Sequence, residues 1–117
     1  LRGADDLDEI AALAIAGDGR LLALDRRRRL LLRLARNGAI ESRVGGEETF
    51  DDPAGLAVAP DGSLLVLDAG RGEIVRLSAA GAVLARGGGA EPGRLERAVG
   101  IAVDGGGRVF VLDLGGA

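Results

Sequence analysis

Four consecutive arginines at positions 26–29 are the feature of this sequence with the clearest capacity for chemistry. A guanidinium group presents a planar fork of N–H donors, which binds carboxylate, phosphate or sulfate groups bidentately. These arginines therefore suggest a face for a small anionic ligand or a partner protein. The candidate residues of that face are Arg26, Arg27, Arg28, Arg29, Arg71, Glu48, Asp51 and Arg94. The simpler alternative, which we favour, is a solvated loop whose arginines pair with nearby acids, since exposed pairs contribute little.

Residues for covalent or acid–base catalysis are scarce in this chain. It has no His, Cys, Lys or Tyr, and all 15 basic residues are Arg. Its three serines therefore lack the His or Lys that would activate them as nucleophiles. Only carboxylates remain as acids or bases, and no apolar pocket is identifiable that would shift their pKa values. We expect no catalytic residue and no cofactor within these 117 residues.

Metal and nucleotide sites are not expected either. The acidic cluster Asp5, Asp6, Asp8 and Glu9 lacks the Asp-x-Asp-x-Asp-Gly spacing of a calcium loop. The glycine-rich stretches are not phosphate-binding loops, because a Walker loop requires Gly-Lys and a dinucleotide fingerprint requires a following helix.

A repeat of about 43 residues positions the candidate residues. Segments 13–25, 56–68 and 101–113 share an apolar run, a turn rich in Asp or Gly, and a second apolar run that ends in Asp. The pattern predicts short strands at 13–16, 21–24, 30–34, 39–43, 56–59, 64–67, 74–77, 82–86, 101–103 and 109–112. Four short antiparallel strands that recur at this period are typical of a β-propeller blade.

We therefore expect an all-β fold of four-stranded antiparallel meanders that form a partial propeller ring. The single domain would span 1–117, with blade units at about 7–49, 50–94 and 95–117, the last one incomplete. Stretches 8–14 and 28–36 have good helix propensity, but propensity is a weak indicator. In the second copy these stretches carry Pro53 and several glycines, which a helix would not keep.

Three aspartates end the second strand of each unit, namely Asp25, Asp68 and Asp113. They are either ligands on one face of the ring or acceptors of backbone N–H groups in the following loop. We favour the structural role, because the position recurs in every unit. Gly19 and Gly62 are the matching turn residues of the preceding hairpins.

These units resemble the NHL-repeat family of propellers. The resemblance rests on residues 50–58 with Asp61, Gly62 and 64–68, and it recurs at 92–95, 99–104 and 107–113. It implies a non-catalytic module for protein or ligand binding or sensing. The alternative that it implies is a fragment of a propeller enzyme, lactonase-like or lyase-like, whose catalytic residues lie in blades outside this chain.

Charge and hydropathy narrow the choice of partner. The net charge of −3 and the two aromatic residues argue against nucleic acid as a partner. No apolar run is long enough to span a membrane as a helix. The chain begins at Leu1 without a Met, so we expect it to be a piece of a longer protein whose further blades come from the same or another chain. The residues leave the compartment undetermined, and family resemblance alone slightly favours an extracytoplasmic one.

Overall fold

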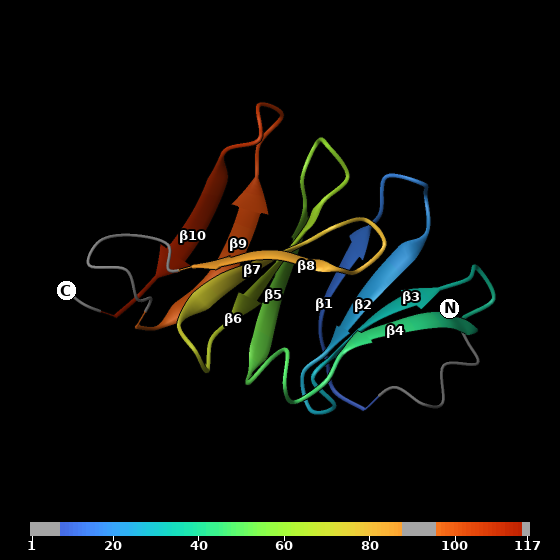
Figure 1. Ribbon diagram of the computed structural model, residues 1–117, viewed down its shortest axis with the longest axis horizontal. Coiled ribbons are helices and arrows are strands. Elements are labelled where there is room, and N and C mark those ends of the chain that lie inside the picture. Colours follow the sequence, from blue (N-terminus) through green and yellow to red (C-terminus); the bar gives the residue numbers. More distant parts are fainter. Residues whose placement is uncertain (1–7, 88–95, 116–117) are drawn as a thin grey trace.

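Three antiparallel sheets lie side by side in the computed structural model, which describes residues 8–87 and 96–115 (Figure 1). Within each sheet, strands that are consecutive in the sequence are neighbours, so every sheet is a simple meander. The first sheet contains β1 (Ile10–Ile15), β2 (Leu21–Asp25), β3 (Leu30–Leu34) and β4 (Ile40–Gly45). The second contains β5 (Pro53–Val58), β6 (Leu64–Asp68), β7 (Glu73–Leu77) and β8 (Val83–Gly87). The third contains β9 (Ala98–Val103) and β10 (Val109–Asp113).

The prediction of all-β meanders is confirmed, and the described residues contain no helix. Each first hairpin is closed by a turn with a glycine in the left-handed region, at Gly19 (φ 87°), Gly62 (φ 88°) and Gly107 (φ 86°). The amide of Gly19 donates to the carbonyl of Ala16 at 2.9 Å, and Gly62 makes the same bond to Ala59. A residue with a side chain would be strained at this backbone conformation, so the turn favours glycine.

The first strand of each sheet starts three residues before its predicted position. Prediction placed the second of these strands at 56–59, whereas β5 spans Pro53–Val58. Pro53 and Gly55 read as strand breakers in the sequence. In the structure Pro53 pairs with Asp68 beyond a register shift between Pro53 and Gly55. A bulge tolerates both residue types, and the same shift occurs in the first sheet between Ile10 and Ala12.

The main core lies between the first and second sheets. Strand residues alternate between two faces of a sheet, and we call the face of the first sheet that meets the second its front face. This face carries Ala12, Ala14, Leu22, Leu24 and Leu31. The second sheet meets it with its back face, which carries Leu56, Val58, Leu64, Val66, Val75 and Leu77. Small alanines opposite large aliphatic residues let the two sheets approach closely.

The second and third sheets repeat this arrangement. Leu67 and Ile74 on the front face of the second sheet pack with Ile101 and Val111 on the back face of the third. Gly55 faces this boundary, and a Cβ atom built on it would lie 3.1 Å from Cγ2 of Ile101. The close approach of the two sheets therefore depends on a residue without a side chain at this position.

Phe50 anchors the connection between β4 and β5. Its ring is fully buried in the core between the first two sheets. Gly45 lies against it, because a Cβ on Gly45 would come within 2.6 Å of Cε2 of Phe50 and 2.9 Å of the Arg29 carbonyl oxygen. Gly45 and Gly46 both have positive φ angles, of 110° and 116°, but a Cβ on Gly46 would meet nothing within 4 Å.

Gly45 and Gly46 therefore allow the cost of backbone strain to be measured separately from the cost of steric overlap. We expect Gly46→Ala to lower the free energy of unfolding by about 1–2 kcal/mol through strain alone. Gly45→Ala adds overlap with the buried ring and should cost roughly 2–4 kcal/mol. Urea denaturation of both variants measures the difference. Equal losses would show that Phe50 yields without cost.

Candidate functional site

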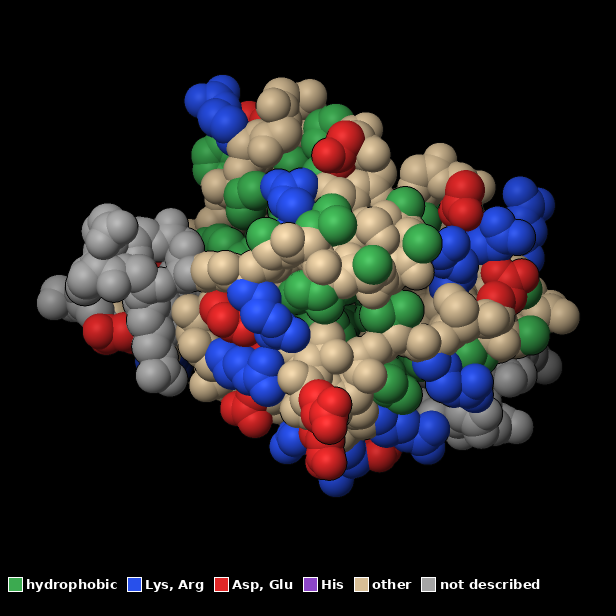
Figure 2. All heavy atoms as spheres, in the orientation of Figure 1, with side chains coloured by type: hydrophobic (Ala, Val, Ile, Leu, Met, Phe, Trp, Pro, Cys, Tyr) green, Lys and Arg blue, Asp and Glu red, His purple; other side chains and the backbone are tan. Residues whose placement is uncertain are grey.

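The predicted arginine loop and the connection between β4 and β5 meet at one edge of the first two sheets. Positive and negative side chains are interleaved along the lower edge of the space-filling view, where the ribbon places these two segments (Figures 1 and 2). An open depression of about 390 Å³ lies here. It is lined by Glu9, Arg26, Arg27, Arg29, Asp51 and Asp52. The arginines and the carboxylates of this lining are equal in number, so the depression is charge-balanced rather than strongly basic.

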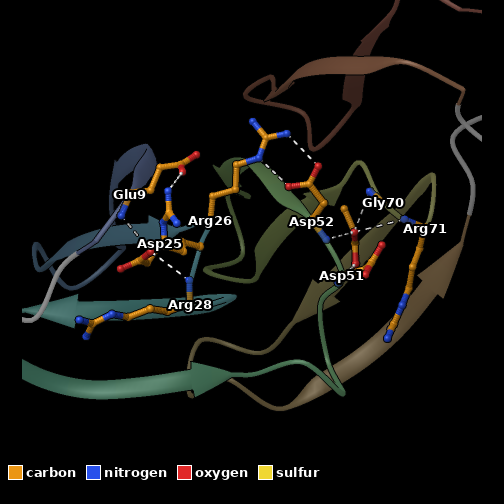
Figure 3. A network of polar contacts seen from close by, with 10 residues as sticks. Glu9, Asp25, Arg26, Arg28, Asp51, Asp52, Gly70 and Arg71 are labelled. Atoms are coloured by element: carbon orange, nitrogen blue, oxygen red, sulfur yellow. Dashed lines mark hydrogen bonds and ion pairs between the residues drawn. The ribbon is translucent and has the colours of Figure 1, made fainter.

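Arg26 bridges the first and second sheets through a bidentate ion pair. Its Nε lies 2.5 Å from Oδ1 of Asp52 and its Nη2 lies 2.8 Å from Oδ2 (Figure 3). The hydrogen bonds from Arg26 hold the pKa of the Asp52 carboxyl below its ordinary value, and they raise the pKa of Arg26. Asp52, which was not among the predicted face residues, is the residue that receives this guanidinium.

Arg27 is held more loosely. Its Nε lies 3.4 Å from Oδ2 of Asp8 and its Nη2 lies 3.6 Å from Oε1 of Glu9, with two thirds of the arginine side chain exposed. Pairs of this kind are screened by solvent and stabilise the fold little.

Arg28 and Arg29 present guanidinium groups that make no hydrogen bond or ion pair with the described residues. The backbone amide of Arg28 donates to Oδ1 of Asp25 at 3.2 Å, and the residue itself is exposed. Arg29 has a φ angle of 60° and is the one residue other than glycine with a positive φ among the described residues. The matching residue of the second sheet is Gly72, with a φ of 63°.

The remaining predicted face residues lie near the second sheet. Nη1 and Nη2 of Arg71 donate to the carbonyl oxygens of Thr49 and Glu48, at 3.2 and 3.3 Å. Glu48 thus contributes its backbone to this contact, while its side chain is exposed. The Asp51 carboxylate lies against Gly70, where an added Cβ would collide with it. Arg94 lies outside the described residues.

Asp25, Asp68 and Asp113 accept backbone hydrogen bonds from two directions. The carboxylate of Asp68 accepts from the amides of Asp51 and Asp52 at 2.8 and 2.9 Å, before β5. It also accepts from Gly70 and Arg71, in the loop after β6. Asp25 does the same with Asp8, Glu9 and Arg28, and Asp113 with Glu96, Arg97 and Gly115. Asp25 and Asp68 are fully buried.

In Asp25 and Asp113 these bonds favour the charged carboxylate. Burial alone would raise the pKa of Asp25, but the amides of Asp8, Glu9 and Arg28 outweigh burial, and the pKa lies below its ordinary value. The pKa of Asp113 is also lowered, first by the amide of Arg97 and then by those of Gly115 and Glu96.

A second polar feature, which sequence reasoning missed, lies at the opposite edge. Arg33 of β3 reaches from the first sheet to the second, where its Nη2 donates to the carbonyl oxygen of Ala79 at 2.5 Å. Its Nη1 lies 3.7 Å from Oδ2 of Asp18, and its Nε is buried without a partner. The sequence contains a signal for this feature, because an arginine interrupts an apolar strand here and again, one repeat later, at Arg76.

Residues 8–87 and 96–115 hold no group of three or more acidic, His or Cys side chains arranged to bind a metal ion. The same ranges contain no helix that is long and apolar enough to cross a membrane.

The fold of this chain is similar to the folds of several solved structures. The chain is similar to virginiamycin B lyase from Staphylococcus aureus, with a TM-score of 0.75 at 13% identity over 90% of this chain and 34% of the other. It is similar to the WD40 β-propeller domain of Doa1, with a TM-score of 0.69 at 15% identity over 91% of this chain and 34% of the other. It is also similar to hydrazine synthase from Kuenenia stuttgartiensis, with a TM-score of 0.73 at 18% identity over 98% of this chain and 32% of the other.

The three sheets are therefore blades of a partial β-propeller, and the chain spans about a third of the length of these three structures. More particularly, residues 50–77, which hold β5, β6 and β7, match the family model for the NHL repeat. The resemblance predicted from the sequence is thus confirmed. A search of curated proteins gave no match.

The buried aspartates can be tested by an isosteric change. In Asp25→Asn an NH₂ group replaces one acceptor oxygen and faces amide donors, which should cost about 2–4 kcal/mol of unfolding free energy. Asp113→Asn makes the same change in the more exposed third sheet and should cost less. Urea denaturation compares the two variants, and a negligible loss for Asp25→Asn would contradict the structural role.

The Arg26–Asp52 pair predicts a pH dependence. Because the folded state lowers the pKa of Asp52, the unfolded state takes up the proton first as the pH falls. The stabilisation is therefore complete above the ordinary value of 3.8 and is lost as the pH falls below it. Urea denaturation between neutral pH and pH of about 3 should show a shallower loss for Asp52→Asn than for the parent chain. Glu48→Gln is the matched control, and it should leave the slope unchanged.

Proposed function

We propose that this chain is a non-catalytic binding module, and that Arg28 and Arg29 receive carboxylate groups of a partner protein segment. The observation that carries the proposal is the conformation of Arg29. A left-handed backbone costs a residue with a side chain about 1 kcal/mol relative to glycine. The second sheet meets the same requirement with Gly72.

The fold does not need an arginine at this position. The contribution of residue 29 to the scaffold is its carbonyl oxygen, which accepts the amide of Gly46 at 2.8 Å. Glycine would supply the same acceptor without strain. An arginine side chain at a strained position, without a hydrogen bond or ion pair to the described residues, supports a role in binding.

The local charges favour a carboxylate-bearing segment over a compact anion. Arg26 and Arg27 form ion pairs with acidic residues, whereas Arg28 and Arg29 form none among the described residues, although the charge of Arg29 helps to lower the pKa of Asp52. Asp51 and Asp52 line the same depression and would repel a small dianion such as phosphate. An extended peptide can place its carboxylates on the exposed Arg28 and the half-buried Arg29 and keep the rest of its length away from these acids.

The second candidate function is a part of a propeller enzyme. Its supporting observation is the similarity in fold to virginiamycin B lyase, at 13% identity. Since this chain has no His, Lys or Cys, the catalytic groups would come from blades beyond its 117 residues. Catalysis by a longer form of the protein, unaffected by substitution of Arg28 and Arg29, would favour this candidate over the binding module.

Replacement of Arg29 by glycine separates binding from stability. We expect Arg29→Gly to raise the free energy of unfolding by about 0.5–1 kcal/mol, because the strain is removed. The same variant should weaken binding of a fluorescein-labelled glutamate-rich peptide by about threefold to tenfold in fluorescence anisotropy. The matched control is Arg36→Gly, which removes an equal charge from the turn between β3 and β4, at the opposite edge.

Two results would contradict the proposal. One is equal loss of peptide binding in the two variants, which would indicate attraction by net charge alone. The other is tighter binding of inorganic phosphate than of the peptide, which would assign the arginines to a small anion.

A further inference from the structure

Asn37 carries the one side-chain amide of this chain, because the sequence has no other asparagine and no glutamine. Gly38 follows it in the turn that joins β3 to β4 (Figure 1). Asparagine is among the thermolabile residues of proteins, since its side chain can react with the backbone nitrogen of the next residue. A glycine in that place hinders the reaction least, because it has no side chain.

The reaction needs water but no oxidant or reductant. The nitrogen of Gly38 loses its proton to hydroxide and attacks Cγ of Asn37, and the new C–N bond closes a succinimide ring. The bond from Cγ to the side-chain nitrogen breaks, and this nitrogen takes up a proton and leaves as ammonia. Water then opens the ring at either of its carbonyl carbons, which yields aspartate or isoaspartate at position 37. The net change consumes a water, releases an ammonia and adds a negative charge.

The turn holds both reacting groups. The amide of Gly38 donates to the carbonyl oxygen of Ala35 at 2.9 Å, and Gly38 is buried although Asn37 is exposed. Oδ1 of Asn37 accepts the amide of Ala39 at 2.9 Å. A buried, hydrogen-bonded amide gives up its proton less readily than an amide in water, because the resulting anion would lack both solvation and that hydrogen bond. The closed turn therefore restrains the nitrogen that has to attack.

The scaffold does not require an asparagine at this position. In the second sheet the corresponding turn, between β7 and β8, has Ala80 in its place. This turn keeps the same backbone bond, from the amide of Gly81 to the carbonyl oxygen of Ser78 at 2.9 Å. Gly38 and Gly81 also share a positive φ, of 91° and 100°. We therefore expect Asn37→Ala to keep the turn.

We propose that Asn37 is a deamidation site of this chain, and that opening of the turn at 35–39 controls the rate at which its amide becomes a carboxylate. The two products differ in their effect on the fold. An aspartate keeps an oxygen that can accept the amide of Ala39. An isoaspartate adds a methylene group to the backbone, so it lengthens the turn that the bond between Gly38 and Ala35 closes. This inference is independent of the proposed function.

Intact-mass spectrometry follows the reaction, because replacement of NH₂ by OH raises the mass and no other side chain of the sequence can undergo it. Asp-Gly pairs can form the same ring, but they lose and regain water without a net change in mass. The parent chain is incubated at mildly alkaline pH, once folded and once unfolded in guanidinium chloride. We expect the folded chain to react at least about tenfold more slowly. Asn37→Ala should gain no mass in either state.

A variant that loosens the turn tests the control of the rate. Ile40, the first residue of β4, pairs with Leu34 and packs against the cluster that contains it. Ile40→Ala removes part of this packing beside the turn. It should speed both deamidation of the folded chain and hydrogen exchange of the Gly38 amide by about threefold or more. The matched control is Val83→Ala, at the same position of the second sheet, which should change neither rate. Circular dichroism confirms that both variants are folded.

Three results would overturn the proposal. One is an unchanged mass in the unfolded parent chain, which would mean that Asn37 does not deamidate. Another is an equal rate in the folded and unfolded chains, which would mean that the turn gives no protection. The third is an equal acceleration in Val83→Ala and Ile40→Ala, which would assign control of the rate to global unfolding instead of this turn.

Discussion

The carboxylate at the end of each second strand, buried in the first two sheets, makes the interaction on which this architecture depends. Asp25 and Asp68 each accept amides from the residues that precede the first strand of their sheet and from the loop that follows the second strand. A buried charge requires such donors, so the two segments are drawn to one edge. The Arg26–Asp52 pair lies at that edge, between loops whose amides the aspartates hold.

Packing between the sheets depends on small side chains lying opposite large aliphatic ones, rather than on large aromatic rings. Small residues on one face, such as Ala12, Ala14 and Gly55, lie opposite larger aliphatic residues on the next sheet. Phe50 is the one large ring in this core, and it requires a glycine beside it. The boundary between the first and second sheets and the boundary between the second and third are alike in this respect.

The period of the repeat and its Asp-Gly turns were enough to predict the meanders, since both follow from backbone geometry that recurs in each unit. The early start of β5 was not predictable in this way, because a bulge accepts Pro53 and Gly55 where a regular strand would not. The pairing of Arg26 with Asp52 was not predictable either, because the sequence does not show which neighbouring carboxylate faces the guanidinium. Likewise the left-handed Arg29 is visible only in the structure, although its alignment with Gly72 was a signal.

The locality of each meander has a consequence for biosynthesis. Every strand of the first sheet pairs with its neighbours in the sequence, and the Asp25 carboxylate reaches back only 16 or 17 residues for its amide donors. Contacts of such short sequence separation form early, at low entropic cost of loop closure. A blade can therefore assemble as it leaves the ribosome, before the next blade has been translated. The nascent blade then exposes its front face until its successor emerges, so the order of synthesis is also the order in which the interfaces are sealed.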